Sequence, residues 1–131
     1  MPRTRQIADY MKREPFTLSP AMSVPQAIDR LLERQLSCAP VMERNVLVGV
    51  FSESDALQGA LDAGYHGTEP GRVGDYMSRE VHTLNILNTV LEAAELFLRH
   101  HHSTMPVLSG TRLVGQLSRH DILRAAAVSL D

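Results

Sequence analysis

The sequence predicts an α/β fold made of two tandem β-α-β-β-α repeats, which pack sheet to sheet with approximate two-fold symmetry. The first observation is an internal repeat: residues 7–57 align with residues 73–123 without a gap, at a constant offset of 66 residues, and about 19 of the 51 aligned pairs are identical. The second is that short apolar runs alternate with segments of helical periodicity inside each copy. A repeat of about 50 residues buries too little surface to be stable alone, so the two copies are expected to share a core.

The offset also sets the expected boundaries of the repeats. We place the first repeat at residues 5–62 and the second at residues 73–127. Between them, residues 63–72 are expected to form a linker, because three glycines and a proline fall within eight residues, 64–71.

The first repeat should begin with a short helix at residues 3–11 and a short strand at residues 16–18. A longer helix is expected after Ser23, because a hydroxyl three residues before Gln26 has the spacing of a capping box. Pro25 is tolerated there, since the first N–H groups of a helix have no partner within it.

Two strands are expected next, at residues 38–42 and 46–51, with a turn at residues 43–45. The second strand is almost continuously apolar, which is typical of a strand covered on both faces. Ser52 should then cap a last helix. The second repeat is expected to follow the same order 66 residues later.

Composition excludes several classes of function. The chain has 131 residues and a formal net charge of −2, which gives no electrostatic case for binding nucleic acid. The single cysteine, Cys38, leaves no internal disulfide and no cysteine-rich metal site. No apolar run is long enough to cross a bilayer, and the N-terminus lacks the apolar core of a signal peptide. We therefore expect a reduced, cytoplasmic protein with no nucleic-acid or membrane partner.

Each repeat ends in a strand-to-helix turn with a hydroxyl and, three residues later, a carboxylate. The turns are Gly-Val-Phe-Ser-Glu-Ser-Asp at residues 49–55 and Gly-Gln-Leu-Ser-Arg-His-Asp at residues 115–121. A helix start attracts phosphate, and a carboxylate can accept hydrogen bonds from ribose hydroxyls. The same residues also suit an ordinary helix start, where an N-cap and an acid contribute about 1 kcal/mol each without any ligand. The turn alone leaves both interpretations open.

The duplicated pattern resembles a tandem cystathionine beta-synthase (CBS) domain pair, often called a Bateman module. The resemblance rests on Asp-Tyr-Met at residues 9–11 and 75–77, on Ala-Pro-Val and Met-Pro-Val, and on the two turns, and it covers roughly residues 5 to 127. It implies a regulatory module that binds an adenosine-containing ligand, such as AMP, ADP, ATP, NAD or S-adenosylmethionine, in clefts between the repeats, with AMP or ATP favoured. It also implies a homodimer stacked through its helices, which signals to a separate protein partner of unknown identity.

In proteins of this family, the Ser or Thr of the turn contacts phosphate and the Asp holds the ribose hydroxyls. The resemblance therefore implies two equivalent sets of ligand-binding residues. They are Thr17, Ser37, Cys38, Ala39, Ser52, Ser54 and Asp55 in the first repeat, and Thr83, Ser103, Thr104, Met105, Pro106, Ser118, His120 and Asp121 in the second.

The two turns differ in charge. Glu53 should repel an anion at the first turn, whereas Arg119 and His120 should attract one at the second. We therefore expect the turn from Ser118 to Asp121 to be the tighter phosphate site.

Three consecutive histidines, residues 100–102, do not predict a metal site. Successive helical residues point about 100° apart, so the three rings cannot converge on one ion. They lie near an expected helix C-terminus, where positive charge is favourable, and a minor role of His102 near a ligand is left open. His82 replaces Phe16 and is expected to cover the core, with contact to a base as the alternative. Cys38 is expected to be a buried small residue and not a nucleophile.

No catalytic motif stands out. The sequence has no nucleophile elbow, no Walker lysine and no zinc-ligand spacing, so a non-catalytic nucleotide sensor is the first expectation. A module that dimerises without binding a nucleotide is the alternative, and Glu53 favours it. A small enzyme that acts on a nucleotide, with His120 as acid or base, is the third hypothesis.

Overall fold

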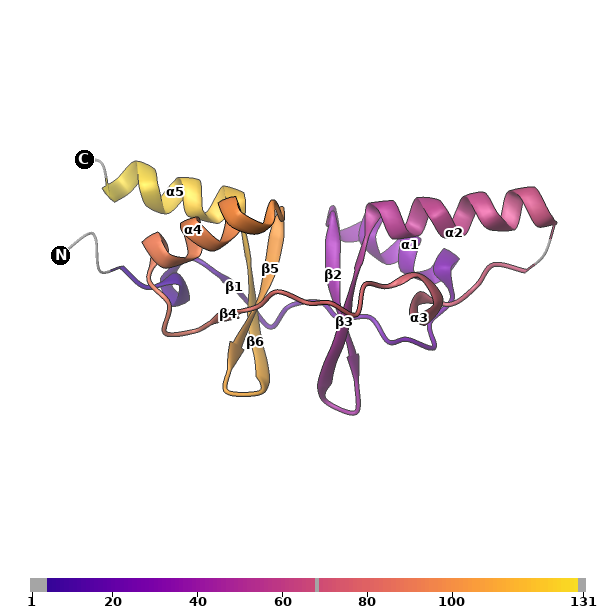
Figure 1. Ribbon diagram of the computed structural model, residues 1–131, viewed down its shortest axis with the longest axis horizontal. Helices are drawn as coiled ribbons and strands as arrows, with labels where there is room; N and C mark the ends of the chain where they lie inside the picture. Colours follow the sequence, from indigo (N-terminus) through magenta and orange to yellow (C-terminus); the bar gives the residue numbers. More distant parts are fainter. Residues whose placement is uncertain (1–4, 68, 130–131) are drawn as a thin grey trace. The chain divides into compact units, whose positions relative to one another are not determined.

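The computed structural model describes residues 5–67 and 69–129, which form two compact units. The contiguous unit consists of residues 16–81, and the split unit combines residues 5–15 with residues 82–129. Each unit contains helices beside a small sheet, so the predicted α/β fold of two repeats is confirmed (Figure 1).

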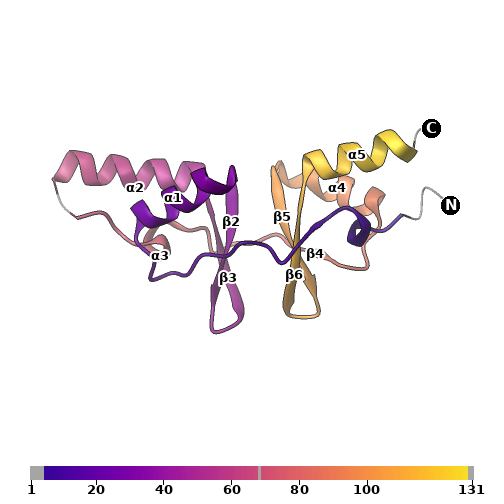
Figure 2. The ribbon, with the colours of Figure 1, turned by 180° about the vertical axis from the view of Figure 1, so that it is seen from behind.

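The contiguous unit is built on an antiparallel hairpin with helices beside it. Its elements are α1 (Val24–Arg34), β2 (Cys38–Glu43), β3 (Val46–Ser52), α2 (Glu53–His66) and α3 (Val73–Tyr76). Strands β2 and β3 pair from Cys38 opposite Ser52 to Glu43 opposite Val46. Helices α1 and α2 lie beside each other along this hairpin in both views (Figure 1; Figure 2).

The split unit has the same plan with two further short strands. Its elements are the 3-10 helix η2 (Ile7–Asp9), β1 (Lys12–Arg13), β4 (Leu84–Asn85), α4 (Val90–His100), β5 (Thr104–Ser109), β6 (Arg112–Ser118) and α5 (Arg119–Ser129). The sheet order is β1-β6-β5-β4, with β4 parallel to β5 and the other pairs antiparallel.

The starts of α1 and α4 confirm the capping boxes. The Ser23 hydroxyl accepts from the Gln26 N–H at 3.3 Å, and the Thr89 hydroxyl accepts from the Glu92 N–H at 3.1 Å. The side chains of Gln26 and Glu92 accept in return from the backbone of the cap residue. These reciprocal bonds satisfy helix N–H groups that have no partner within the helix.

Each unit has its own apolar core. Each core also includes residues from the lead-in segment of the other repeat, which we define as residues 5–15 of the first repeat and residues 73–81 of the second. The contiguous core holds Leu18, Val24, Ala27, Leu31, Ala39, Val41, Phe51, Ala56, Val73 and Met77. The split core holds Ile7, Met11, Leu84, Val90, Ala93, Phe97, Met105, Val107, Leu117, Ile122 and Ala125. The compact units therefore differ from the sequence repeats, because the two repeats exchange their lead-in segments.

Backbone pairing fixes this exchange. Lys12 pairs with Gln116 in the split unit, and Ser78 makes the equivalent bridge with Val50 in the contiguous unit, with N–H to carbonyl distances of 2.9 and 3.0 Å. Glycine is needed where the lead-in segment crosses the strand. A Cβ atom at Gly49 would lie 2.6 Å from the Ser78 carbonyl oxygen, and one at Gly115 would lie 2.8 Å from the Lys12 carbonyl oxygen.

Two expected elements are shorter than the sequence suggested. The strand expected at residues 16–18 is a single parallel bridge between Leu18 and Val41. Pro15 and Pro20 flank it, and neither can donate an N–H to a ladder. The helix expected at residues 3–11 is only the 3-10 turn η2, because the chain pairs with β6 from Lys12 onward; residues 1–4 lie outside the described part.

None of the helices in residues 5–67 and 69–129 is both long enough and apolar enough to cross a membrane.

Candidate functional site

The two strand-to-helix turns have the same backbone anchoring. In each unit the first residue of the last helix donates its N–H to the carbonyl that precedes the neighbouring strand. Glu53 donates to Ser37 at 3.0 Å, and Arg119 donates to Ser103 at 3.0 Å. Strand pairing then places Cys38 opposite Ser52 and Thr104 opposite Ser118. The structure therefore brings the predicted strand residues next to the predicted turn residues within each unit.

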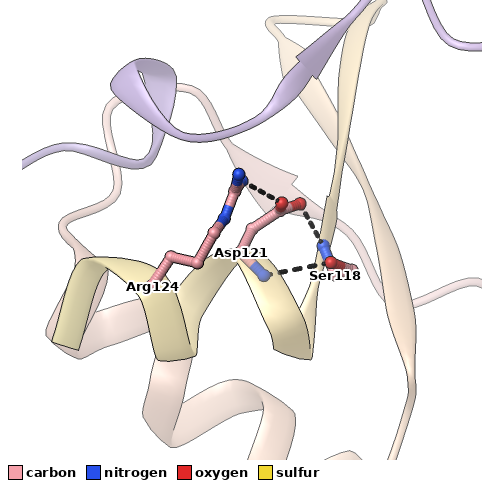
Figure 3. A network of polar contacts seen from close by, with 3 residues as sticks. All are labelled: Ser118, Asp121 and Arg124. Carbon is pink, nitrogen blue, oxygen red and sulfur yellow. Dashed lines mark hydrogen bonds and ion pairs between the residues drawn. The ribbon is translucent and has the colours of Figure 1, made fainter. Parts of the chain in front are cut away.

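Both turns are capping boxes. The Ser52 N–H donates to Asp55 Oδ2 at 2.8 Å, and the Asp55 N–H donates to the Ser52 hydroxyl at 3.2 Å. The equivalent distances between Ser118 and Asp121 are 2.9 and 3.1 Å (Figure 3). The helix-start interpretation is thus confirmed for both turns, and the contacts hold the hydroxyl and the carboxylate side by side.

The hydroxyl groups of the two turns are used differently. The Ser52 hydroxyl also donates to Asp55 Oδ2 at 3.0 Å. In the described part of the chain, the Ser118 hydroxyl makes no equivalent contact and only accepts, from the Asp121 N–H. A serine hydroxyl has one hydrogen to donate, so Ser118 can give its hydrogen to a ligand without losing an internal bond.

The two carboxylates also differ in their partners. Asp121 is 4% exposed, and Arg124 donates to its Oδ1 at 2.5 Å (Figure 3). Arg124 itself reaches solvent, with 58% of its side chain exposed. Gln58 stands at the position equivalent to Arg124, and it donates to Asp62 at 2.9 Å instead of to the half-buried Asp55. Asp121 must therefore share or release Arg124 before it can accept hydrogen bonds from ribose hydroxyls.

The charged residues predicted at the starts of α2 and α5 are exposed in the structure. Glu53 and Ser54 are exposed on α2, and Arg119 and His120 are exposed on α5. The Arg119 side chain is held in place, because its Nε donates to the His102 carbonyl at 2.6 Å. The start of α5 therefore carries a fixed cation, whereas the start of α2 carries an anion.

The remaining predicted site residues divide into buried and accessible ones. Ala39 and Met105 lie in the cores of their units and Pro106 is also buried, so they can offer a ligand only their backbone. A contact of the Met105 side chain with a base would require the core to open. Side chains that are partly or fully exposed belong to Thr17, Ser37, Cys38, Thr83, Ser103 and Thr104.

Cys38 does not have the properties of a nucleophile. Burial, and secondly the negative charge of Asp55, raises the pKa of the Cys38 thiol to about 11. The thiolate is the reactive form of cysteine, so this group stays a neutral thiol near pH 7.

A group of histidines at the end of α4 is the feature that sequence reasoning missed. The His82 and His100 rings are stacked with centroids 3.8 Å apart, and His82 Nδ1 lies 2.8 Å from His102 Nε2. Burial lowers the pKa of His102, and the nearby His82, His100 and Arg119 lower it further. Across residues 5–67 and 69–129, no three His, Cys, Asp or Glu side chains are arranged to hold a metal ion.

The stacking of His82 on His100 could have been found by comparing equivalent positions of the two repeats. The guanidinium of Arg34, at the end of α1, lies 4.2 Å from the centre of the Phe16 ring. His82 and His100 occupy the same two positions in the other unit. The sequence alone assigned His82 to the core and treated the other histidines separately, so it did not bring the rings together.

Comparison with known proteins identifies the family. The family model of the CBS domain matches residues 7–62 and 73–128. The chain belongs to the CBS domain family. The resemblance found in the sequence is thereby confirmed, and a CBS pair is a regulatory module instead of a catalytic domain. The hypothesis of a small enzyme that uses His120 is therefore dropped.

Relatives of this CBS pair include short and long proteins. CBS domain-containing protein YhcV of Bacillus subtilis is 25% identical over 116 residues, which cover 88% of this chain and 81% of YhcV. The A-adding tRNA nucleotidyltransferase of Aquifex aeolicus is 31% identical over 127 residues, or 96% of this chain. The chain spans only 15% of the length of that enzyme.

Solved structures of CBS pairs share the fold. Arabidopsis thaliana CBSX2 in complex with AMP has a TM-score of 0.83 and 28% identity, covering 97% of this chain and 99% of that one. The CBS domain pair of protein MJ0100, in complex with 5′-methylthioadenosine and S-adenosyl-L-methionine, has a TM-score of 0.81 and 21% identity, covering 95% and 98%.

Proposed function

We propose that this CBS pair is a non-catalytic sensor that binds an adenosine-containing ligand at its strand-to-helix turns. The observation that carries the proposal is a turn that occurs twice, holding a serine hydroxyl and an aspartate carboxylate side by side. The likeness to CBSX2, a structure determined with AMP at 28% identity over nearly the whole chain, supports it.

The roles of the residues follow from hydrogen bonding and charge. The positive end of α5 and the Ser118 hydroxyl favour a phosphate group. Asp121 accepts from the ribose hydroxyls once Arg124 moves, which its exposed side chain allows. Among the described residues of the contiguous unit, no cation pairs with Asp55, but Glu53 in the first turn of α2 repels phosphate. We therefore propose that the split unit binds phosphorylated ligands and that the contiguous unit binds less charged ones.

A thermal-shift panel with AMP, ADP, ATP, NAD and S-adenosylmethionine tests the proposal, with GTP as the base-specificity control. A ligand at 100 times its Kd adds about 2.7 kcal/mol to the free energy of unfolding. The transition should then rise by roughly 5 °C for a domain of this size. AMP or ATP is expected to give the largest shift and GTP a small one. Shifts of zero with all adenosine ligands at millimolar concentration would reject the sensor.

Asparagine variants locate the binding site. Asp121→Asn keeps an oxygen that can accept the Ser118 N–H, so the capping bond survives while the negative charge is lost. Asp55→Asn is the matched variant of the other turn. Asp121→Asn is expected to weaken AMP binding at least tenfold and Asp55→Asn much less. Equal losses would contradict the assignment of phosphate binding to the split unit.

The second candidate function is a dimerisation module that needs no ligand, and exposed leucines on the helices favour it. Leu32 and Leu57 are 70% and 71% exposed, beside a groove of about 210 Å³ between α1 and α2 that is lined mainly by aliphatic side chains. We propose a homodimer through the helices, in the cytoplasm, with an unidentified protein partner. Sedimentation should show a dimer that Leu57→Glu converts to a monomer. Leu87→Glu, equally exposed but outside the helices, should leave the dimer intact.

A further inference from the structure

The histidine cluster, defined as His82, His100 and His102, lies entirely within the split unit. His82 is stacked on His100, with ring planes 14° apart, and shares a hydrogen bond with His102. Such a bond between imidazoles needs one N–H donor and one nitrogen acceptor. One added proton keeps this bond and strengthens it, whereas a second proton would replace the acceptor and break it.

The cluster is joined to the proposed phosphate site by Arg119. The Arg119 side chain donates to the His102 carbonyl at 2.6 Å, and its N–H donates to the Ser103 carbonyl at 3.0 Å. Arg119 is also the first residue of α5, directly after Ser118. A charge gained by the cluster therefore lies close to the turn.

The neighbours of His102 oppose its protonation when no anion is present. Partial burial lowers the pKa of His102, and His82, His100 from α4 and Arg119 from α5 lower it further. Arg99 and His101 flank His100, and His120 follows Arg119, while Glu80 precedes His82 by two residues. A phosphate at the start of α5 would offset this repulsion, because a nearby opposite charge favours the charged form of a titratable group.

We propose that the histidine cluster takes up a proton from solvent when a nucleotide phosphate binds at the α5 turn, so that the split unit selects phosphorylated adenosine ligands increasingly as the pH falls. This inference rests on the proposed nucleotide-binding function. Histidine is the side chain whose charge changes near physiological pH, so the cluster would couple ligand choice to pH. The contiguous unit has Phe16, Arg34 and Leu36 at the equivalent positions, and none of these is a histidine.

Calorimetric titration of the full chain with AMP and with uncharged adenosine, at pH 8 and pH 6, tests the inference. One proton gained across this range is expected to make AMP bind about tenfold more tightly at pH 6. Adenosine binding should not change. Repeating the titration in two buffers of different ionisation enthalpy counts the protons directly. The AMP phosphate itself titrates near pH 6. The contribution of the cluster is therefore the difference in proton uptake between wild type and the histidine variants described next.

Variants of the cluster separate its contribution from that of the nucleotide. His82→Asn and His102→Gln should remove the proton uptake and the pH-dependent gain. His101→Asn is the matched control from the same run of histidines, since His101 is exposed at the left-handed C-cap of α4, a conformation that asparagine tolerates. It should behave as wild type. Proton NMR of wild type provides a second measurement without mutation: the His102 ring signals should titrate at higher pH with AMP bound.

The outcomes distinguish this inference from the proposed function. AMP binding with the same pH dependence in wild type and His102→Gln, together with ring titrations that AMP does not move, would overturn the proton coupling and leave the sensor function standing. No binding of AMP or adenosine at either pH would overturn both.

Discussion

The contiguous unit and the split unit place different chemistry in one geometry. In the contiguous unit, Arg34 at the end of a helix lies over the Phe16 ring; in the split unit, His100 stacks on His82 at the same positions. The first pair keeps a fixed charge at all physiological pH values, and the second can gain or lose one. The contact between the end of the helix and residue 16 or 82 is thus common to both units, whereas the histidines that can respond to pH are found in the split unit.

The two strand-to-helix turns also share their geometry and differ in their charged partners. Each aspartate closes a capping box with its serine, and within the described residues only Asp121 also pairs with an arginine. Features that hold the helix start are shared by the units, and features that set local charge differ. Some substitutions are therefore expected to have equal effects at equivalent positions of the two units. Others are expected to have an effect in one unit only.

The largest effect should come from the glycines at which the lead-in segments cross the strands. Gly49→Ala and Gly115→Ala each place a Cβ atom 2.6 Å from a neighbouring atom, the Ser78 carbonyl oxygen and the Met11 sulfur respectively. Each is expected to lower the free energy of unfolding by about 1–3 kcal/mol, measured by urea denaturation. Gly64→Ala, a helical site with nothing within 4 Å, should instead be neutral or stabilising. A marked loss at only one of the first two positions would break the equivalence of the units.

An intermediate effect is expected at the third residue after each aspartate. Arg124→Ala leaves the buried Asp121 without its cation, and it should cost about 1 kcal/mol, limited because the arginine is mostly solvent-exposed. Gln58→Ala is the matched change in α2 and should cost less than about 0.5 kcal/mol. The same denaturation curves measure both. Equal costs would mean that the Arg124 contact does not distinguish the two turns.

The smallest effect should be the pH dependence of stability. Because the pKa of His102 is lowered from 6.5 in the folded protein, the unfolded chain binds the proton more tightly. The free energy of unfolding should therefore fall as the pH decreases below about 6.5, by less than about 0.5 kcal/mol for a partly exposed ring. His102→Gln should reduce this slope, and His101→Asn should not. The measurement is the urea midpoint between pH 7.5 and pH 5.5.

Much of the fold could be predicted from the sequence because its signals are local. The offset of 66 residues, the capping boxes at Ser23 and Thr89 and the hairpin after Cys38 each depend on residues close in the chain. The turn residues were found for the same reason. Their dual use, as helix caps and as candidate ligand groups, could not be resolved by pattern alone.

What the sequence did not predict depends on contacts between distant segments. The pairing of Lys12 with Gln116 joins opposite ends of the chain, and no local pattern indicates it. The hydrogen bond between His82 and His102 and the pairing of Arg124 with Asp121 likewise depend on which side chains the fold brings together. Sequence reasoning assigned the strand at residues 16–18 from its composition, but the flanking prolines limit it to one bridge.

The exchange of lead-in segments has a consequence for the order in which the protein is made. The contiguous unit is complete once residue 81 has been synthesised, so it can fold while the ribosome is still translating the rest. Residues 5–15 are made earlier still, but their partner strand β6 ends at Ser118 and emerges only after the whole contiguous unit. Residues 5–15 therefore leave the ribosome before the contiguous unit but pack after it, and until β6 has been made the apolar side chains of Ile7 and Met11 have no core to enter.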